Sequence, residues 1–432
     1  MATTDFAHAL LRQEAQALIS RLEHVRPFSV SMPMVPAASV SRSALVAIEH
    51  HMSTRRRQLR ELMSQFLRWA DGPGRNQTPA DLQRRFTVLR LRFNSVLTQF
   101  DIFADVLTQR AEHGTGVWVA GLDVLAEDAL RLPGYYEPPP VICYIDRGHG
   151  AAIRRARTRL PGGDSNPVAV IQVPRERLVG SGIASSLVHE VGHQAASLLE
   201  LVPSLTAELT REASRAAGST KLAWRLLTRW ISEIVADFWS VAKVGVTATL
   251  GLLAVVSLPR AFVFRIDAED PHPTPWVRVK LSCAMGRALY PDPQWSVVEK
   301  AWESLYPPSA LSTSVQETLL QVSALLPRFA TLVATHRNTK TKGQPLSAVA
   351  ARRDVAPDNL RAIGERLAKG HPVLETLSPI IAVAVLGQRR FGGRMLPRAE
   401  GRVLQQLLTR WATARSLASD ANLRTSPGSM VA

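Results

Sequence analysis

The sequence predicts an α+β fold that is mostly α-helical, with one small sheet near the middle of the chain. Apolar residues recur at helical spacing over most of the 432 residues, whereas only two short β-branched runs have the pattern of strands. The composition is 46% hydrophobic and 20% charged, which is typical of a globular protein of two or three domains. The same composition excludes collagen-like, intrinsically disordered and disulfide-stapled classes.

The first 130 residues form the predicted N-terminal helical region. Helical spacing over residues 43–70 and 78–112 indicates two long amphipathic helices, which a Gly-Pro-Gly segment ending at Gly74 separates. Thr78 is the expected N-cap of the second helix, because a proline follows it at the first helical position. These helices show no residue pattern of a catalytic site.

A proline cluster over residues 132–140 opens the predicted core region, residues 131–310. Consecutive prolines cannot continue a helix, so this cluster marks a boundary. Residues 141–145 and 167–174 are short β-branched runs between turn residues and predict two strands. A helix from about residue 183 to 199 follows, with Ser181 or Ser185 as its expected N-cap.

Residues 311–432 form the predicted C-terminal helical region and carry most of the positive charge. The formal net charge of the whole chain is +16, of which +10 lies in this region, +4 in residues 131–310 and +2 in residues 1–130. The arginines stand among leucines and alanines, without an RNA-binding or zinc-finger pattern. We therefore favour a solvated face, or a docking surface for an acidic protein partner, over a nucleic-acid partner.

The cysteines and the N-terminal segment indicate in which cellular compartment the protein is expected. Cys143 and Cys283 are too few for a thiolate zinc site or a disulfide framework, so a reducing compartment fits best, with a single bridge left open. The N-terminal segment has an acid at Asp5 and no continuous apolar run, which argues against a secretory signal. We expect a cytoplasmic protein, with export without a cleaved signal as the alternative. His113 and His149 stand alone in glycine-rich turns and are expected at the surface.

The predicted core helix contains the motif His189-Glu190-Val191-Gly192-His193, an HExxH. Histidines four residues apart lie on one face of a helix, so both imidazoles can reach a single ion. The glutamate beside the first histidine can then act as general base toward a water at that ion. The alternative is a helix with two ordinary histidines, but the flanking residues are apolar and would bury the three polar side chains without partners.

A catalytic zinc normally has three protein ligands, so a third is expected. Glu233 and Asp237 lie four residues apart in an otherwise apolar helix, where two carboxylates are costly unless they are paired or bind a cation. Glu233 fits the third ligand, and Asp237 fits the acceptor that orients a ligand histidine. Alternative third ligands are the more polar positions Glu200, Glu208 and Glu212. Two imidazoles and one carboxylate favour Zn²⁺ over other metals.

These motifs resemble the gluzincin zinc metallopeptidases. The form Glu233-Ile-Val-Ala-Asp237 is similar to the family that includes the prenyl-protein endopeptidases, the heat-shock membrane proteases and the mitochondrial inner-membrane stress protease. That family also carries a later His-Pro with an arginine six residues after the histidine, as in His272 and Arg278 here. The resemblance covers about residues 180–280 and implies a zincin-like metallopeptidase core. It also implies that His272 lies near the substrate or the oxyanion, and that Arg278 pairs with an acid such as Asp237. The alternative for His272 is a turn histidine among prolines.

The chain departs from that family in its membrane segments. Residues 210–221 are polar, so no span lies between the two motifs, and the apolar run over residues 244–258 is shorter than the about 20 residues a bilayer requires. We expect that run to be a buried helix under the site. A membrane span is thus not expected, although peripheral association stays open.

The resulting prediction is a zinc metalloendopeptidase, a hydrolase acting on a protein or peptide substrate. Glu190 would be its general base, and the strand over residues 167–174 would offer an edge on which an extended peptide docks. The competing class is a non-enzymatic binding, delivered or accessory protein with a structural zinc site. Such a site would close its fourth position with another protein ligand, for which His272 is available.

Overall fold

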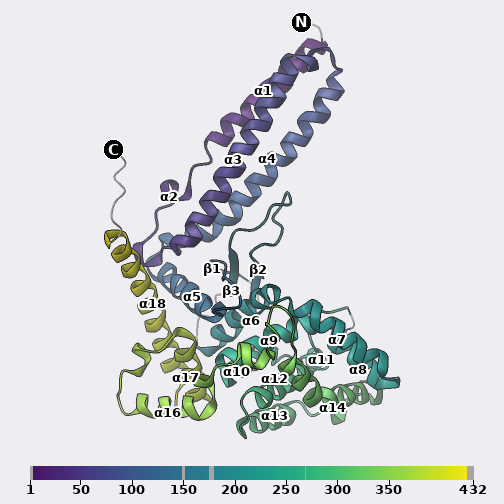
Figure 1. Cartoon of the computed structure of the whole chain (residues 1–432), viewed down its shortest axis with the longest axis vertical. Coiled ribbons are helices and arrows are strands. Elements are labelled where there is room, and N and C mark those ends of the chain that lie inside the picture. Colours follow the sequence, from purple (N-terminus) through teal and green to yellow (C-terminus); the bar gives the residue numbers. More distant parts are fainter. Residues whose placement is uncertain (1–2, 148–150, 175–179, 268, 426–432) are drawn as a thin grey trace.

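The computed structural model describes residues 3–147, 151–174, 180–267 and 269–425, and within them the fold is mostly helical with one small sheet, as predicted (Figure 1). The helices of the first half are α1 (Thr3–Glu23), α2 (Phe28–Ser31), α3 (Arg42–Asp71), α4 (Pro79–Thr108), α5 (Gly114–Leu130), α6 (Ser181–Leu198), α7 (Leu201–Arg215) and α8 (Gly218–Arg229). Those of the second half are α9 (Ile231–Val244), α10 (Val246–Val256), α11 (Arg260–Val263), α12 (Pro275–Leu289), α13 (Gln294–Leu305), α14 (Thr313–Thr335), α15 (Leu346–Ala350), α16 (Pro357–Ala368), α17 (Pro379–Phe391) and α18 (Pro397–Thr425). The strands are β1 (Val141–Asp146), β2 (Ala152–Arg154) and β3 (Ala169–Pro174).

Helices α1, α3 and α4 form an arm that extends away from the rest of the protein (Figure 1). Two of them match the predicted helices, and Thr78 is the N-cap of α4, where its hydroxyl accepts a hydrogen bond from the Asp81 N–H at 3.2 Å. The apolar faces of the arm form one buried cluster that continues onto one face of the sheet through Ile142, Val168 and Val170. The arm is therefore seated on the sheet by the same apolar stripe that holds its helices together.

The sheet has the strand order β1-β3-β2. Strand β3 pairs in parallel with β1 and antiparallel with β2, so both of its edges are occupied. The expectation that residues 167–174 offer a docking edge is therefore wrong, because the outermost described strand on that side is β2. Sequence patterns missed β2 because it has only three residues and a single β-branched side chain, Ile153.

A second buried cluster unites α5, the opposite face of the sheet and the helices that follow. Helix α5 lies against α18, the last described helix, so chain segments almost 300 residues apart share this core (Figure 1). The division into residues 1–130, 131–310 and 311–432 stays a prediction.

A fully buried ion pair lies where the arm, the sheet and α5 meet. The Arg110 guanidinium donates to both carboxylate oxygens of Asp123 at 3.0 and 3.1 Å, and both side chains are 0% exposed. Arg110 also donates to the Cys143 carbonyl, and Asp123 accepts from the Cys143 N–H, so the pair is tied to β1. Arg415 of α18 adds a second cation near Asp123 at 3.4 Å.

Removing one partner of this pair is expected to destabilise the protein strongly. Arg110→Ala leaves the buried Asp123 charge without its main partner, and we expect the free energy of unfolding to fall by about 3–5 kcal/mol. The matched control is Arg84→Ala, which breaks an exposed pair with Asp81 on α4 and should cost less than about 1 kcal/mol. Denaturant unfolding of the two variants measures the difference, and equal losses would contradict a special role for the buried pair.

Helices α6, α9 and α10 form the centre of the main core. Gly192 of α6 allows the close approach of α9, because a Cβ at this position would lie 2.8 Å from the Ala236 Cα. Gly245 separates α9 from α10 at a φ of 58°, a left-handed conformation that favours glycine, and so redirects the chain. The N-cap of α6 is Gly180, not Ser181 or Ser185, since the helix begins at Ser181.

The apolar run over residues 244–258 forms α10, which packs against α6, α12 and α17, as expected of a buried helix. Helix α10, with 11 residues, is too short to cross a bilayer; among the described residues, one helix, α14, is long and apolar enough by length and composition. Its buried side, which includes Leu319, Val322 and Phe329, packs against α8 and α12.

The remaining expectations concern single side chains. Cys143 and Cys283 are both buried and free, so the open disulfide is not formed. His113 is exposed as expected, whereas His149 lies outside the described residues. Several C-terminal arginines form ion pairs within the protein: Arg390 with Glu400, Arg394 with Glu365, and Arg410 with Glu375. An acidic partner for this region stays a prediction.

Candidate metal centre

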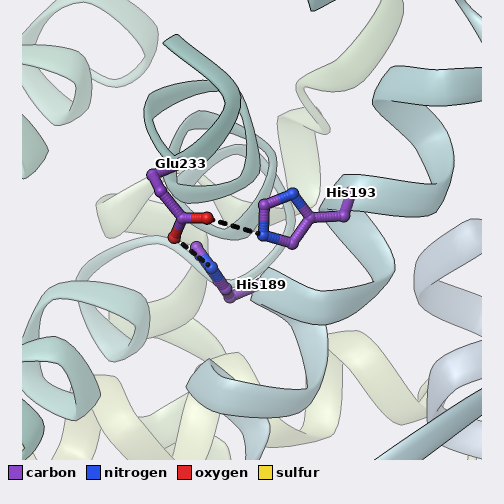
Figure 2. A group of neighbouring side chains, drawn as sticks. All are labelled: His189, His193 and Glu233. Carbon is purple, nitrogen blue, oxygen red and sulfur yellow. Dashed lines mark ion pairs between the residues drawn. The ribbon is translucent and has the colours of Figure 1, made fainter. Parts of the chain in front are cut away.

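Helix α6 presents His189 and His193 on one face, one turn apart, toward Glu233 of α9 (Figure 2). The two imidazole ring centroids are 4.8 Å apart and the ring planes are nearly perpendicular, at 86°. One ligand atom from each of the three side chains lies within 4.8 Å of the other two. Residues 40 positions apart are thus brought together by the packing of α6 on α9, which Gly192 permits.

Each imidazole faces one oxygen of the same carboxylate. His189 Nε2 lies 3.2 Å from Glu233 Oε2, and His193 Nε2 lies 3.3 Å from Glu233 Oε1 (Figure 2). Nitrogen and oxygen ligands about 2.0–2.1 Å from a tetrahedral zinc lie about 3.3 Å from one another. The two nitrogen-to-oxygen separations are therefore of the size expected between ligands of one such ion.

Asp237 and Arg278 hold the ligand histidine from behind. Asp237 Oδ1 lies 2.8 Å from His189 Nδ1, and Arg278 of α12 donates to both oxygens of Asp237 at 2.6 and 2.9 Å. The Arg278 guanidinium also reaches Glu233 at 3.4 Å. With Nδ1 of His189 bound to a carboxylate, its Nε2 is the nitrogen that faces Glu233, which is the tautomer arrangement a metal ligand requires.

The charges of these groups depend on one another. Burial alone would lower the pKa of His189, but the carboxylates of Asp237 and Glu233 outweigh it and raise that pKa to about 9. Burial opposes ionisation of Asp237, yet Arg278 and His189 lower its pKa to about 2, and the two histidines likewise hold the pKa of Glu233 well below its ordinary value. The site therefore contains two ionised carboxylates that attract a cation to the imidazoles, where it competes with protons.

Glu190 has a different environment from the other acids. Its side chain points to the same cavity but is only 7% exposed, and burial raises its pKa. A carboxylate with a raised pKa is a better proton acceptor near neutral pH than an ordinary glutamate. The acids of the site thus differ in pKa: that of Glu190 is raised, which suits a base, whereas those of Glu233 and Asp237 are lowered, which keeps both carboxylates ionised.

His272 stands at the mouth of the site, with 55% of its side chain exposed. Asp270 accepts hydrogen bonds from the His272 backbone N–H at 2.9 Å and contacts its ring Nδ1 at 2.8 Å. The ring is thereby oriented with Nε2 3.6 Å from Glu233 Oε2. Asp270 received no role from the sequence, although an aspartate two residues before a histidine is the spacing of an Asx-turn and could have indicated it.

The three alternative acids are engaged elsewhere. Glu200 pairs with Lys340, Glu212 pairs with Arg328, and Glu208 contacts His336 Nδ1 at 2.7 Å. His336 Nε2 in turn lies 2.8 Å from the Ser204 hydroxyl, which gives the contacts of a Ser-His-Glu triad. Ser204 also donates to carbonyls of its own chain segment, and His336 is 6% exposed, so this network ties α7 to the segment after α14.

A cavity of about 500 Å³ opens beside the candidate ligands. Its lining includes Ala152 and Ile153 of β2 and one face of α10. The same β2 residues also line a second cavity of about 610 Å³ between the sheet and α4. Strand β2 therefore lies between the metal site and a second hollow at the base of the arm.

The residues that the sequence singled out thus assemble into one site: His189, Glu190, His193, Glu233, Asp237, Arg278 and, at its mouth, His272. The features that the sequence did not reveal are Asp270 and the β2 edge, whereas α10 lines the cavity as expected of a buried helix under the site. No family model, curated protein or solved structure matches the chain.

Proposed function

We propose that this protein is a zinc-dependent endopeptidase. The observation that carries the proposal is that two imidazole nitrogens lie 3.2 and 3.3 Å from the two oxygens of one carboxylate, with a buried glutamate beside them at an open cavity. The resemblance to gluzincins in the order of the three motifs supports it. We also infer a zincin-like core, because a small sheet precedes the HExxH helix and a second helix supplies the acid.

His189, His193 and Glu233 would hold the ion. When bound, Zn²⁺ supplies Lewis-acid polarisation of a carbonyl and lowers the pKa of water toward 7. Glu190 accepts a proton from the attacking water as its oxygen bonds to the carbonyl carbon, and gives that proton to the leaving nitrogen as the C–N bond breaks. Its buried position keeps its pKa raised and therefore suits both transfers.

His272 and Arg278 have separate tasks in this scheme. His272 Nε2 is aimed toward Glu233 by Asp270, so it can donate a hydrogen bond to the oxyanion that forms on the substrate. Arg278 is largely buried; it fixes Asp237, which in turn fixes His189. Arg278 is thus a positioning residue.

Strand β2 offers the edge on which an extended substrate can dock. It is one of the two edge strands of the described sheet, with β1 at the other edge, and it lines the cavity that contains the candidate ligands. A peptide that pairs with β2 would direct alternate side chains to opposite faces of the sheet. One face leads to the metal site and the other to the cavity under α4.

The proposal is tested by metal analysis and cleavage assays on the full chain. We expect about one zinc per chain, cleavage of denatured proteins, loss of cleavage with 1,10-phenanthroline and its recovery on adding zinc. Zinc-loaded protein that cuts no protein or peptide would contradict the proposal. If X-ray absorption then showed four protein ligands, with His272 as the fourth, the non-enzymatic protein with a structural zinc site would replace it.

A further inference from the structure

We propose that the α10 side of the site cavity is a specificity pocket, which binds an uncharged substrate side chain with an apolar stem and a hydrogen-bonding tip, such as tyrosine. This inference rests on the proposed endopeptidase function. It adds the class of residue that the enzyme selects next to the bond it cuts. Three observations support it: the spacing of three apolar residues on α10, the buried hydroxyl of Ser240, and the position of these groups in the same cavity as the candidate metal ligands.

One face of α10 forms the wall of the pocket. Ala248, Leu252 and Val255 all line the cavity, and their spacing of four and three residues places them in one stripe along the helix. At 1.5 Å per residue the stripe is about 10 Å long, which is enough for one large side chain. These three residues carry no charge, so a charged side chain lying along the stripe would lose hydration without gaining a partner on α10.

The deep end of the pocket is small and polar. Ser240 of α9 and Ser282 of α12 line it beside Ala248, the smallest residue of the stripe. Ser282 already bonds to Thr249 at 2.8 Å. The Ser240 hydroxyl is buried, with the residue 3% exposed, and has no hydrogen-bond partner among the described residues. A buried hydroxyl without a hydrogen-bond partner destabilises the protein. A ligand that supplies a partner for this hydroxyl removes that cost and so binds more tightly.

The pocket adjoins the reacting groups. Ser240 lies three residues after Asp237 on α9, hence on the same side of that helix, and the cavity that the pocket belongs to also contains His189, Glu190 and Glu233. A side chain placed along α10 therefore belongs to a substrate residue next to the scissile bond. Ala248 limits its length, and Ser240 recognises its tip.

Binding of peptidyl hydroxamates to the zinc-loaded protein tests the pocket without requiring turnover. The compounds differ at one side chain only: glycine, phenylalanine, tyrosine, lysine or aspartate. We expect the tyrosyl compound to bind roughly 10-fold or more tighter than the glycyl, lysyl and aspartyl compounds, and about 3- to 10-fold tighter than the phenylalanyl compound. Ser240→Ala should remove the difference between tyrosyl and phenylalanyl.

The size of the pocket is tested by Ala248→Phe. The larger side chain should fill the end of the pocket beside Ser240 and abolish the preference for the tyrosyl over the glycyl hydroxamate. The matched control is Ala254→Phe, the same change on the exposed side of α10, which should leave the preference unaltered. Because Ala248→Phe could impair folding, Leu252→Ala provides a second variant that should shift the preference toward larger side chains. Zinc content and thermal unfolding are measured for each variant.

The outcomes separate this inference from the proposed function. If the protein cleaves peptides but binds glycyl and tyrosyl hydroxamates equally, or tyrosyl and phenylalanyl equally, the pocket is refuted and the endopeptidase stands. If it binds zinc and shows the expected preference but cuts no peptide, the pocket stands as a ligand site and the endopeptidase is refuted. Absence of zinc binding would overturn both.

Discussion

Glu190→Gln is expected to lower kcat for peptide cleavage by about 10²–10⁴-fold, the range that a general base contributes. The amide keeps the size of the side chain and its place beside the cavity, but it cannot accept the proton of the attacking water. Because Glu190 is not among the candidate ligands, the variant should retain its full zinc content. Cleavage of a fluorogenic peptide under saturating substrate, with zinc measured on the same sample, gives both values.

Glu317→Gln is the matched control for this substitution. It makes the same chemical change at an exposed position on α14 and should leave kcat unchanged. A Glu190→Gln variant that binds zinc and cleaves at the wild-type rate would remove Glu190 as the base. A variant that has lost its zinc would instead show that Glu190 belongs to the metal site, and would refute the separation of base and ligands.

A graded loss of zinc affinity is expected from His193→Ala and Asp237→Asn. Asp237 acts on the ion only through His189, and replacing an outer partner of this kind typically costs about 10–100-fold in metal affinity. His193→Ala removes a ligand atom itself and should cost more than that, leaving cleavage at background. Competition with a zinc chelator of known affinity measures both variants on one scale.

Two further measurements complete this series. His113→Ala removes an exposed histidine outside the site and should bind zinc as the wild type does. Asp237→Asn should also lower the free energy of unfolding, because it leaves the largely buried Arg278 without a full counter-charge. An Asp237→Asn variant that lost zinc as completely as His193→Ala would indicate that Asp237 is a ligand and not its support.

The local parts of the site could be predicted from the sequence because helical spacing is a local property. Histidines four residues apart on a helix must share a face, whatever the helix packs against, and the same holds for Glu233 and Asp237. The cost of burying two carboxylates in an apolar helix then indicated that they have partners. The pairing of Asp237 with Arg278 was expected from the family resemblance, and the structure places these side chains 2.6 Å apart.

The parts that could not be predicted depend on which surfaces meet. Strand β2 has too few residues to show a period, and its place at the sheet edge is set by pairing with β3, which reversed the expectation for residues 167–174. The orientation of His272 depends on Asp270, and the hydroxyl of Ser240 became notable only once its surroundings showed no partner for it. A hydrophobicity pattern shows that a residue is buried but not which residues surround it.

By itself, the sequence determined the mostly helical fold, the HExxH face of α6 and the paired acids of α9, since each follows from spacing within one helix. Tertiary structure decided that these two helices approach closely at Gly192, so that Glu233 reaches both imidazoles. It also decided that the chain turns at Gly245, so that one face of α10 lines the cavity, and that β2 lies at an edge of the sheet beside β3. The physical reason is that contacts between distant segments depend on the shape and packing of whole elements, whereas helical periodicity depends only on neighbours along the chain.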